Sequence, residues 1–332
     1  MLKKILITLV VVLVLAVVVG LLLPRQVRVE RSVLINRPPS MVYAVVNSFR
    51  LFPKWSPWQD LDPTMHQNAE GPRDGVGAKL VWSGNDKVGS GTQVITASKP
   101  DQSVASDLDF GGMGTAKSTV TLTPEGSGTR ATWDVDMDMG ANPIGHYIGL
   151  TMDNMLGKDF AGGLAKLKTL VESMPNADIA GFVAQPVQMQ AATILVVTET
   201  AAPDAIAKAY AEGYTQIAKY MAKNKLHQAG APLGIDGDST ANSYTFDAAI
   251  PVDRADGVGA DGVRVMQSYA GTALKTTHVG PYEGLGKTHD KLMAYIAAHG
   301  YVLKGATISW YVDDPGNTPV DKLRTEIYAP IE

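Results

Sequence analysis

FDAAIPV at residues 246–252 returns as TEIYAPI at residues 325–331, near the end of the chain. Each copy closes a strand–helix–strand pattern, in which apolar residues alternate in the strands and recur every three or four residues in the helix. The expected elements are 192–198, 204–225 and 244–252 in the first copy, and 273–279, 285–299 and 323–331 in the second. Such internal similarity predicts two copies of one unit related by a pseudo-twofold axis, with a cleft between the copies as a natural pocket.

The preceding region has the pattern of a different domain. Alternating apolar and polar residues predict a first strand at 27–35, and Pro38-Pro39-Ser40 begins a short helix. Five further strands are expected at 78–82, 91–98, 103–110, 116–123 and 129–139. The closing helical pattern has one apolar stripe, formed by Leu156, Phe160, Leu164, Leu167 and Val171. We therefore expect an antiparallel sheet folded around one long terminal helix.

The chain begins with a segment typical of a membrane anchor. After Lys3 and Lys4, residues 5–23 carry no charge, and about 20 apolar residues suffice for a helix to cross the hydrocarbon core. A cleavable signal peptide is the alternative, but no Ala-x-Ala pattern precedes Arg25. The short basic N-terminus favours export, whereas three arginines soon after the segment oppose it. We predict a single-pass helix in the inner (cytoplasmic) membrane, with the soluble domains on the extracytoplasmic side.

These patterns predict an α+β chain with an anchor at 1–25, a sheet-and-helix domain at 26–173, a linker at 174–190 and a duplicated domain at 191–332. The linker is rich in Pro, Ala and Gln and lacks strong periodicity. The chain contains no cysteine, which excludes disulfides and thiolate chemistry. A net charge of -4 provides no basic field, so we expect no nucleic acid partner.

Two motifs in the chain, and the absence of a third, bear on its chemistry. GVGADG at 257–262 fits a dinucleotide fingerprint by its letters, but a strand-like VRVMQ follows at 263–267 where a helix is required, so a glycine-rich hairpin is the better interpretation. Asp134, Asp136 and Asp138 alternate with apolar residues, which predicts one solvated strand face and not a converging metal site. No Gly-x-Ser-x-Gly elbow occurs, so a serine hydrolase is not predicted. We expect no metal and no cofactor.

Large aromatic residues are concentrated in the first domain. They admit two interpretations: packing in a core, or lining the mouth of a hydrophobic cavity between the sheet and the long helix. The candidate ligand-binding residues are Trp55, Trp58, Trp82 and Phe110.

The last domain contains a further candidate cluster. His278 and Tyr282 lie close together, Trp310 and Tyr311 follow, and Glu326 sits in a strand. A carboxylate on the inner face of a sheet is costly to bury unless tyrosine hydroxyls or a cationic ligand compensate it. The strand alternation equally allows Glu326 to face solvent, because Thr325 and Ile327 would then point inward.

Residues 191–332 resemble the GyrI-like effector-binding domain of multidrug-sensing transcription regulators. The resemblance rests on VGPYEGL at 279–285 and on DDPGNTPVDKLRTEIYAPI at 313–331. It implies a central glutamate and aromatic residues that bind lipophilic, often cationic, small molecules between the two halves. Glu326 matches that glutamate, Tyr282, Trp310 and Tyr311 match the aromatic wall, and Asp247 is the counterpart of Glu326 by pseudo-symmetry. The regulators' helix-turn-helix is absent, and its place is taken by the anchor and the sheet-and-helix domain.

Residues 28–173 resemble the START/polyketide-cyclase-like (SRPBCC) helix-grip superfamily. FPKWSPWQDLDP at 52–63 and LVWSGN at 80–85 resemble a bacterial branch of it. The resemblance implies a deep cavity for hydrophobic ligands, although functions vary widely in this superfamily.

Our leading hypothesis is a membrane-anchored extracytoplasmic binding protein for hydrophobic, possibly cationic, small molecules. The alternative is a hydrolase of small electrophilic compounds, in which Glu326 activates water and Tyr282 donates to the leaving group. A third hypothesis is a scaffold that binds another envelope protein.

Overall fold

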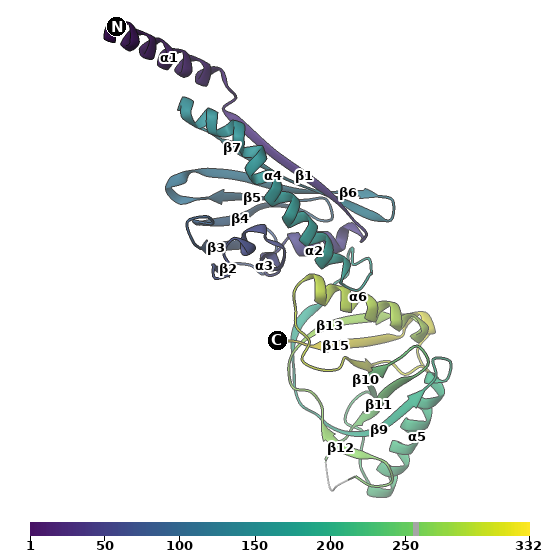
Figure 1. The fold of residues 1–332 in the computed structure, drawn as a ribbon. Coiled ribbons are helices and arrows are strands. Elements are labelled where there is room, and N and C mark those ends of the chain that lie inside the picture. Colours follow the sequence, from purple (N-terminus) through teal and green to yellow (C-terminus); the bar gives the residue numbers. More distant parts are fainter. Residues whose placement is uncertain (255–258) are drawn as a thin grey trace. The chain divides into compact units, whose positions relative to one another are not determined.

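The computed structural model describes residues 1–254 and 259–332. It has the expected α+β composition, with an apolar N-terminal helix and two antiparallel sheets (Figure 1). Two compact units divide the described chain, one made mainly of residues 1–180 and the other mainly of residues 181–332.

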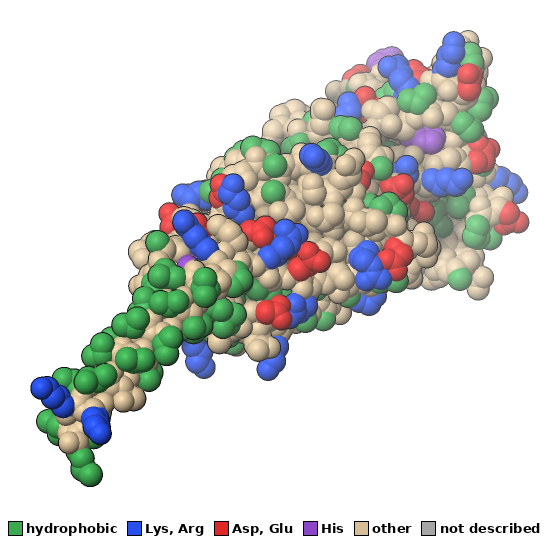
Figure 2. Space-filling view, turned by 90° about the horizontal axis from the view of Figure 1, so that it is seen from above, with side chains coloured by type: hydrophobic (Ala, Val, Ile, Leu, Met, Phe, Trp, Pro, Cys, Tyr) green, Lys and Arg blue, Asp and Glu red, His purple; other side chains and the backbone are tan. Residues whose placement is uncertain are grey.

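Helix α1 (Leu2–Leu22) has the composition of a membrane-spanning helix. An 18-residue window of this helix has a mean hydropathy of 3.4, and only 6% of that window is buried. Hydrophobic side chains cover its exposed surface in the space-filling view (Figure 2). At about 1.5 Å per residue, its 21 residues match the thickness of a bilayer core. Among the residues that the structure describes, α1 is the one helix with this combination of length and hydropathy.

The first sheet has the strand order β1-β7-β6-β5-β4-β3-β2, with every neighbouring pair antiparallel. Of its strands, β2 was not expected, because its residues are polar and mostly exposed. The strands are β1 (Gln26–Ile35), β2 (His66–Glu70), β3 (Lys79–Ser83), β4 (Ser90–Lys99), β5 (Ser103–Asp109), β6 (Thr115–Glu125) and β7 (Gly128–Asp138).

Helix α4 (Pro143–Glu172) is the expected long terminal helix, but it begins well before the apolar stripe. The signal for its start is Asn142, whose side chain accepts a hydrogen bond from Ile144 N (3.0 Å), followed by proline at the first helical position. Of the stripe, Phe160, Leu164, Leu167 and Val171 are buried, and Leu156 is half-buried. The short α2 (Pro39–Val46), α3 (Phe52–Trp55) and 3-10 helix η1 (Pro57–Asp60) also contact α4.

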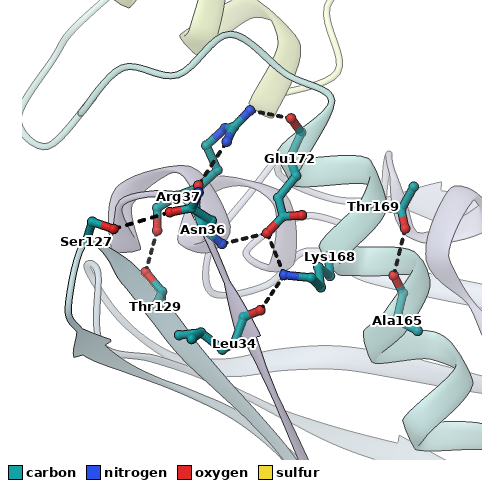
Figure 3. Close-up of polar contacts among 9 residues, drawn as sticks. All are labelled: Leu34, Asn36, Arg37, Ser127, Thr129, Ala165, Lys168, Thr169 and Glu172. Carbon is teal, nitrogen blue, oxygen red and sulfur yellow. Dashed lines mark hydrogen bonds and ion pairs between the residues drawn. The ribbon is translucent and has the colours of Figure 1, made fainter.

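A polar network holds the C-terminal end of α4 against the turn after β1 (Figure 3). The Arg37 guanidinium donates to the carbonyl of Glu172, the last residue of the helix, and to that of Met174, just beyond its end. The Glu172 carboxylate in turn accepts from Asn36 N (2.7 Å) and from Lys168 Nζ (2.6 Å). Carbonyl groups at a helix end lack intrahelical partners, so Arg37 stabilises this end and fixes the helix across the sheet.

The expected solvated face of β7 is only partly solvated. Asp136 and Asp138 are exposed, but Asp134 is buried, because Arg28 of the neighbouring strand lies over it with a nitrogen–oxygen distance of 3.1 Å. Burial raises the pKa of the Asp134 carboxyl, and Arg28 opposes that shift. No group of three or more metal-binding side chains occurs in the described part of the chain.

The second sheet has the strand order β12-β9-β11-β10-β14-β15-β13-β8. Strand β8 falls within the expected linker and pairs with β13, so the second sheet begins earlier than expected. The expected hairpin at 257–262 lies partly outside the described residues. The strands are β8 (Gln185–Met189), β9 (Thr193–Ala201), β10 (Leu233–Ser239), β11 (Tyr244–Pro251), β12 (Arg264–Gln267), β13 (Gly271–Val279), β14 (Ile308–Tyr311) and β15 (Arg324–Pro330).

The order of this sheet reflects the duplication. The first half contributes β9, β10, β11 and helix α5 (Ile206–Asn224), and the second contributes β13, β14, β15 and helix α6 (Leu285–Ala298). The halves meet where β10 pairs with β14. The strand register places Phe246 and Ile327 on the same face of the sheet. Phe246 contacts Tyr210 of α5, and Ile327 lies in one hydrophobic cluster with Leu292 of α6, so both helices pack on that face. The pseudo-twofold arrangement therefore places β10 and β14 beneath the space between the helices.

Candidate functional site

Tyrosines gather over the two central strands of the second sheet. Tyr210 and Tyr214, one turn apart on α5, stack with ring centroids 5.8 Å apart. Tyr311 of β14 contacts Tyr210 edge-on at 5.9 Å, and Tyr282, in the turn before α6, contacts Tyr311 in the same way at 5.4 Å. Helical spacing and the duplication thus bring four aromatic rings from both halves together. We call these four residues and the polar groups beneath them the tyrosine cleft, after the cleft that the duplicated sequence predicts between the two halves.

Tyr210 approaches the sheet closely at Gly234 of β10. A β-carbon on Gly234 would lie 2.3 Å from the Tyr210 hydroxyl oxygen, so only glycine allows this contact. Gly234 is the register partner of Ser309 on β14. The Tyr210 hydroxyl is therefore positioned over the junction of the two halves.

The polar floor of the cleft is centred on Asp236. Its carboxylate accepts hydrogen bonds from the hydroxyls of Tyr244 (2.5 Å) and Thr307. His289 of α6 has Nδ1 3.5 Å from Asp236 Oδ2 and Nε2 3.3 Å from Ser309 Oγ. Side chains of Asp236 and His289 keep 28% and 22% of their exposure, so solvent reaches the floor.

Burial raises the pKa of the phenols of Tyr210, Tyr214, Tyr244 and Tyr311 above the ordinary value of tyrosine. These hydroxyls therefore remain protonated at neutral pH and can donate hydrogen bonds. The cleft thus offers neutral donors, aromatic faces and a carboxylate.

Glu326 lies on the opposite face of the sheet from the tyrosine cleft. Its register partner is Trp310, whereas that of Tyr311 is Thr325. The Glu326 carboxylate accepts hydrogen bonds from Lys275 Nζ (2.7 Å) and the Tyr328 hydroxyl (2.6 Å). Partial burial raises the pKa of Glu326, but the two hydrogen bonds and the positive charges of Lys275 and Arg324 together outweigh burial, and the pKa lies below its ordinary value.

The other predicted residues of this domain are also separated by the two faces. Asp247 shares the face of Glu326 and forms an ion pair with Arg264 at 2.9 Å. His278 stabilises the turn before α6, with Nδ1 2.8 Å from Thr288 Oγ1 and Nε2 3.0 Å from the Pro281 carbonyl oxygen. Of the predicted residues, only Tyr282 and Tyr311 lie in the tyrosine cleft.

A shallow groove of about 750 Å³ lies at the edge of β13. Its lining includes Lys275, His278 and Lys291 and contains no carboxylate among the described residues. It is therefore poorly suited to a cationic ligand.

In the first domain, the predicted aromatic residues mostly pack against each other. Trp133 and Phe160 stack with centroids 4.2 Å apart, and Trp55 and Trp58 contact Trp133 edge-on. The enclosed space between the sheet and α2–α3 measures about 20 Å³, room for about one water molecule. The expected deep cavity is therefore filled by these side chains. Trp82 and Phe110 form a separate, half-buried pair at 5.9 Å.

Asp236, His289 and Ser309 were not identified in the sequence. The two strands that carry Asp236 and Ser309 were not expected, since β10 is rich in glycine and aspartate and β14 has only four residues. The available signal was the Tyr210–Tyr214 pair at helical spacing, which predicts an aromatic face on α5.

Two families match the chain. Residues 185–332 match the GyrI-like small molecule binding domain. The second domain is GyrI-like. Residues 26–172 match the family described as polyketide cyclase / dehydrase and lipid transport. Both matches indicate small-molecule binding. Among curated protein sequences, none matches the chain.

Solved structures match the chain at low identity and low TM-score. The cryo-EM complex of EcmrR with DNA is 15% identical, with a TM-score of 0.41, over 57% of this chain and 72% of that chain. SAV2435 bound to tetraphenylphosphonium is 15% identical, with a TM-score of 0.34, over 46% of this chain and 94% of that chain. A hydrolase from Listeria innocua is 16% identical, with a TM-score of 0.33, over 45% of this chain and 91% of that chain.

Proposed function

We propose that the protein is a membrane-anchored binding protein for hydrophobic, cationic small molecules, and that the tyrosine cleft of the GyrI-like domain is the binding site. One observation carries this proposal. Glu326 is paired with Lys275 and Asp247 with Arg264, whereas Asp236 has no lysine or arginine partner within the described part of the chain. Asp236 is thus the carboxylate whose charge is available to a cationic ligand.

The surroundings of Asp236 suit such a ligand. Tyrosine faces attract cations, by about 0.5–1 kcal/mol at exposed sites and about 2 kcal/mol or more when desolvated. The hydroxyls of Tyr244 and Thr307 donate hydrogen bonds to the Asp236 carboxylate and hold it in place. Tyr282 is half-buried and lies in a short 3-10 turn, so its ring is the part of the wall best placed to move aside for a ligand.

Calorimetric titration of the fragment 26–332, which retains both sheets, tests this function. The titrants are tetraphenylphosphonium and an uncharged aromatic compound of similar size. Asp236→Asn should weaken binding of the cation about tenfold to a hundredfold and leave the neutral compound unaffected, a difference of about 1.4–2.8 kcal/mol. Glu326→Gln, the matched carboxylate on the other face, should change neither. Loss of cation binding in Glu326→Gln alone would move the site to that face.

We also propose that α1 anchors the chain in the cytoplasmic membrane, with both domains on the extracytoplasmic side and without a nucleic acid partner. The absence of cysteine allows a direct test in sealed right-side-out vesicles. A membrane-impermeant maleimide should label Asp321→Cys at once, and Lys3→Cys only after permeabilisation. The reverse pattern would place the domains in the cytoplasm, and release of a shortened soluble chain would identify a signal peptide.

A further inference from the structure

Three side chains in the tyrosine cleft are arranged in the order of a catalytic triad. Ser309 Oγ lies 3.3 Å from His289 Nε2, and His289 Nδ1 lies 3.5 Å from Asp236 Oδ2. The three come from β14, α6 and β10, and none of them is a neighbour of another in the sequence. Serine hydrolases on unrelated folds share this chain of contacts, in which a nucleophile contacts a base and a carboxylate orients that base. Such contacts are often longer without substrate than in the reacting complex.

The environment of Asp236 favours the role of an orienting group. Tyr244 and Thr307 fix its carboxylate by hydrogen bonds, and their hydroxyls cannot neutralise its charge. An ionised Asp236 facing Nδ1 favours the histidine tautomer with the proton on Nδ1. The lone pair of Nε2 then faces Ser309 Oγ, as a general base requires.

The cleft also supplies a donor for a developing oxyanion. The Tyr210 hydroxyl lies over Gly234, and Gly234 is the register partner of Ser309 on the adjacent strand. Directly opposed residues in an antiparallel pair have α-carbons about 4.5–5.5 Å apart. A neutral phenol at this place can donate to an oxygen that turns negative beside Ser309.

We propose that the tyrosine cleft hydrolyses small hydrophobic carboxylic esters, with Ser309 as nucleophile, His289 as general base and acid, and Asp236 as positioning residue. Ser309 Oγ forms a bond to the ester carbonyl carbon while its proton passes to His289 Nε2. The bond from that carbon to the alcohol oxygen then breaks, and the alcohol leaves with the proton from His289. Water attacks the acyl-serine, His289 takes its proton and returns it to Ser309 Oγ, and the acid is released.

Two features limit the substrate. Ser309 is 4% exposed, so a substrate reaches its hydroxyl only when neighbouring side chains move aside. Ser309 also lies within a strand and not on a tight turn, so the attacking oxygen is less exposed than on a nucleophile elbow. Short acyl chains on an aromatic alcohol fit these constraints best.

The test uses the full chain reconstituted in lipid nanodiscs. A fluorophosphonate probe should add one phosphonyl group to the protein, and peptide mass mapping should place it on Ser309. Hydrolysis of p-nitrophenyl butyrate should fall at least about 100-fold in Ser309→Ala and in His289→Gln. Ser239→Ala, an exposed serine on β10 outside the cleft, should leave the rate unchanged.

Labelling at another residue, no labelling, or full hydrolysis by Ser309→Ala would overturn the inference. If a variant does not fold, the site of the adduct on the wild-type chain still decides the question. The same experiments distinguish a failure of this inference from a failure of the proposed binding function. Tetraphenylphosphonium binding without an adduct on Ser309 would refute the hydrolase and keep the receptor, and an adduct without cation binding would do the reverse.

Discussion

Tyr311 and Glu326 lie on adjacent strands but project from opposite faces of the second sheet, because Tyr311 is the register partner of Thr325 and Glu326 that of Trp310. A single shift of register by one residue would exchange these positions. The sheet thus divides the carboxylates into two kinds. Asp236 and Glu326 each accept a hydrogen bond from a tyrosine, but Glu326 also pairs with Lys275, whereas Asp236 has no lysine or arginine partner among the described residues.

We expect Glu326→Gln and Lys275→Met to lower the free energy of unfolding by no more than about 1 kcal/mol each, since the pair is partly exposed and screened. The two effects should not add in the double variant, because either change removes the same ion pair. Urea unfolding of the four proteins measures this coupling. A loss of several kcal/mol would mean that Glu326 is a core group and not an exchangeable partner.

Replacing either of two adjacent glycines in α4 by alanine should change the stability of the protein, in opposite directions for the two positions. A β-carbon on Gly163 would lie 3.0 Å from the Trp133 ring and from Pro57, both rigid, so Gly163→Ala should destabilise the protein by about 1–3 kcal/mol. Gly162 has open space, so Gly162→Ala should stabilise the helix by about 0.5–1 kcal/mol. Thermal unfolding of both variants compares them, and equal effects would contradict the packing of α4 on Trp133.

Gly234→Ala should lower the affinity for a lipophilic cation about tenfold, or about 1.4 kcal/mol, because the new methyl group displaces the Tyr210 hydroxyl. Gly286→Ala is the matched control, since it lies on α6 with nothing near its β-carbon position. Calorimetry measures the affinity, and near-ultraviolet circular dichroism reports the displaced tyrosine. Unchanged binding in Gly234→Ala would separate Tyr210 from the ligand.

The ion pair between Arg31 and Asp153 should give a pH-dependent contribution to stability. Hydrogen bonds from Arg31 lower the pKa of Asp153 below its ordinary value of 3.8. A depressed folded-state pKa contributes stability above the unfolded value, and this contribution is lost as the pH falls through the folded value. The difference in urea midpoint between wild type and Arg31→Met should therefore be constant above about pH 5 and shrink below about pH 4. In an Asp153→Asn background this difference should not depend on pH.

The sequence predicts most of the fold for a simple reason. The long strands of the first sheet and the duplicated units of the second have clear periodicity, and periodicity reports which residues face a core. Residues 233–239 and 308–311 lack it, since β10 alternates glycine with aspartate and β14 is short. Those strands carry Asp236 and Ser309, so the sequence does not indicate the polar groups beneath the tyrosines. Alternation also leaves the orientation of Glu326 open, because it separates the two faces of a strand and does not say which face the helices cover.

The junction of β10 and β14 has a consequence for how this domain could have evolved. A half-length ancestor assembled as a symmetric dimer would present the same residues twice across its axis. Once the two copies are joined in one polypeptide, each can mutate alone. The first copy now supplies a carboxylate and the second a hydroxyl and an imidazole. Fusion thus allows the two halves to carry different functional groups at their junction, which a symmetric dimer of identical halves cannot do.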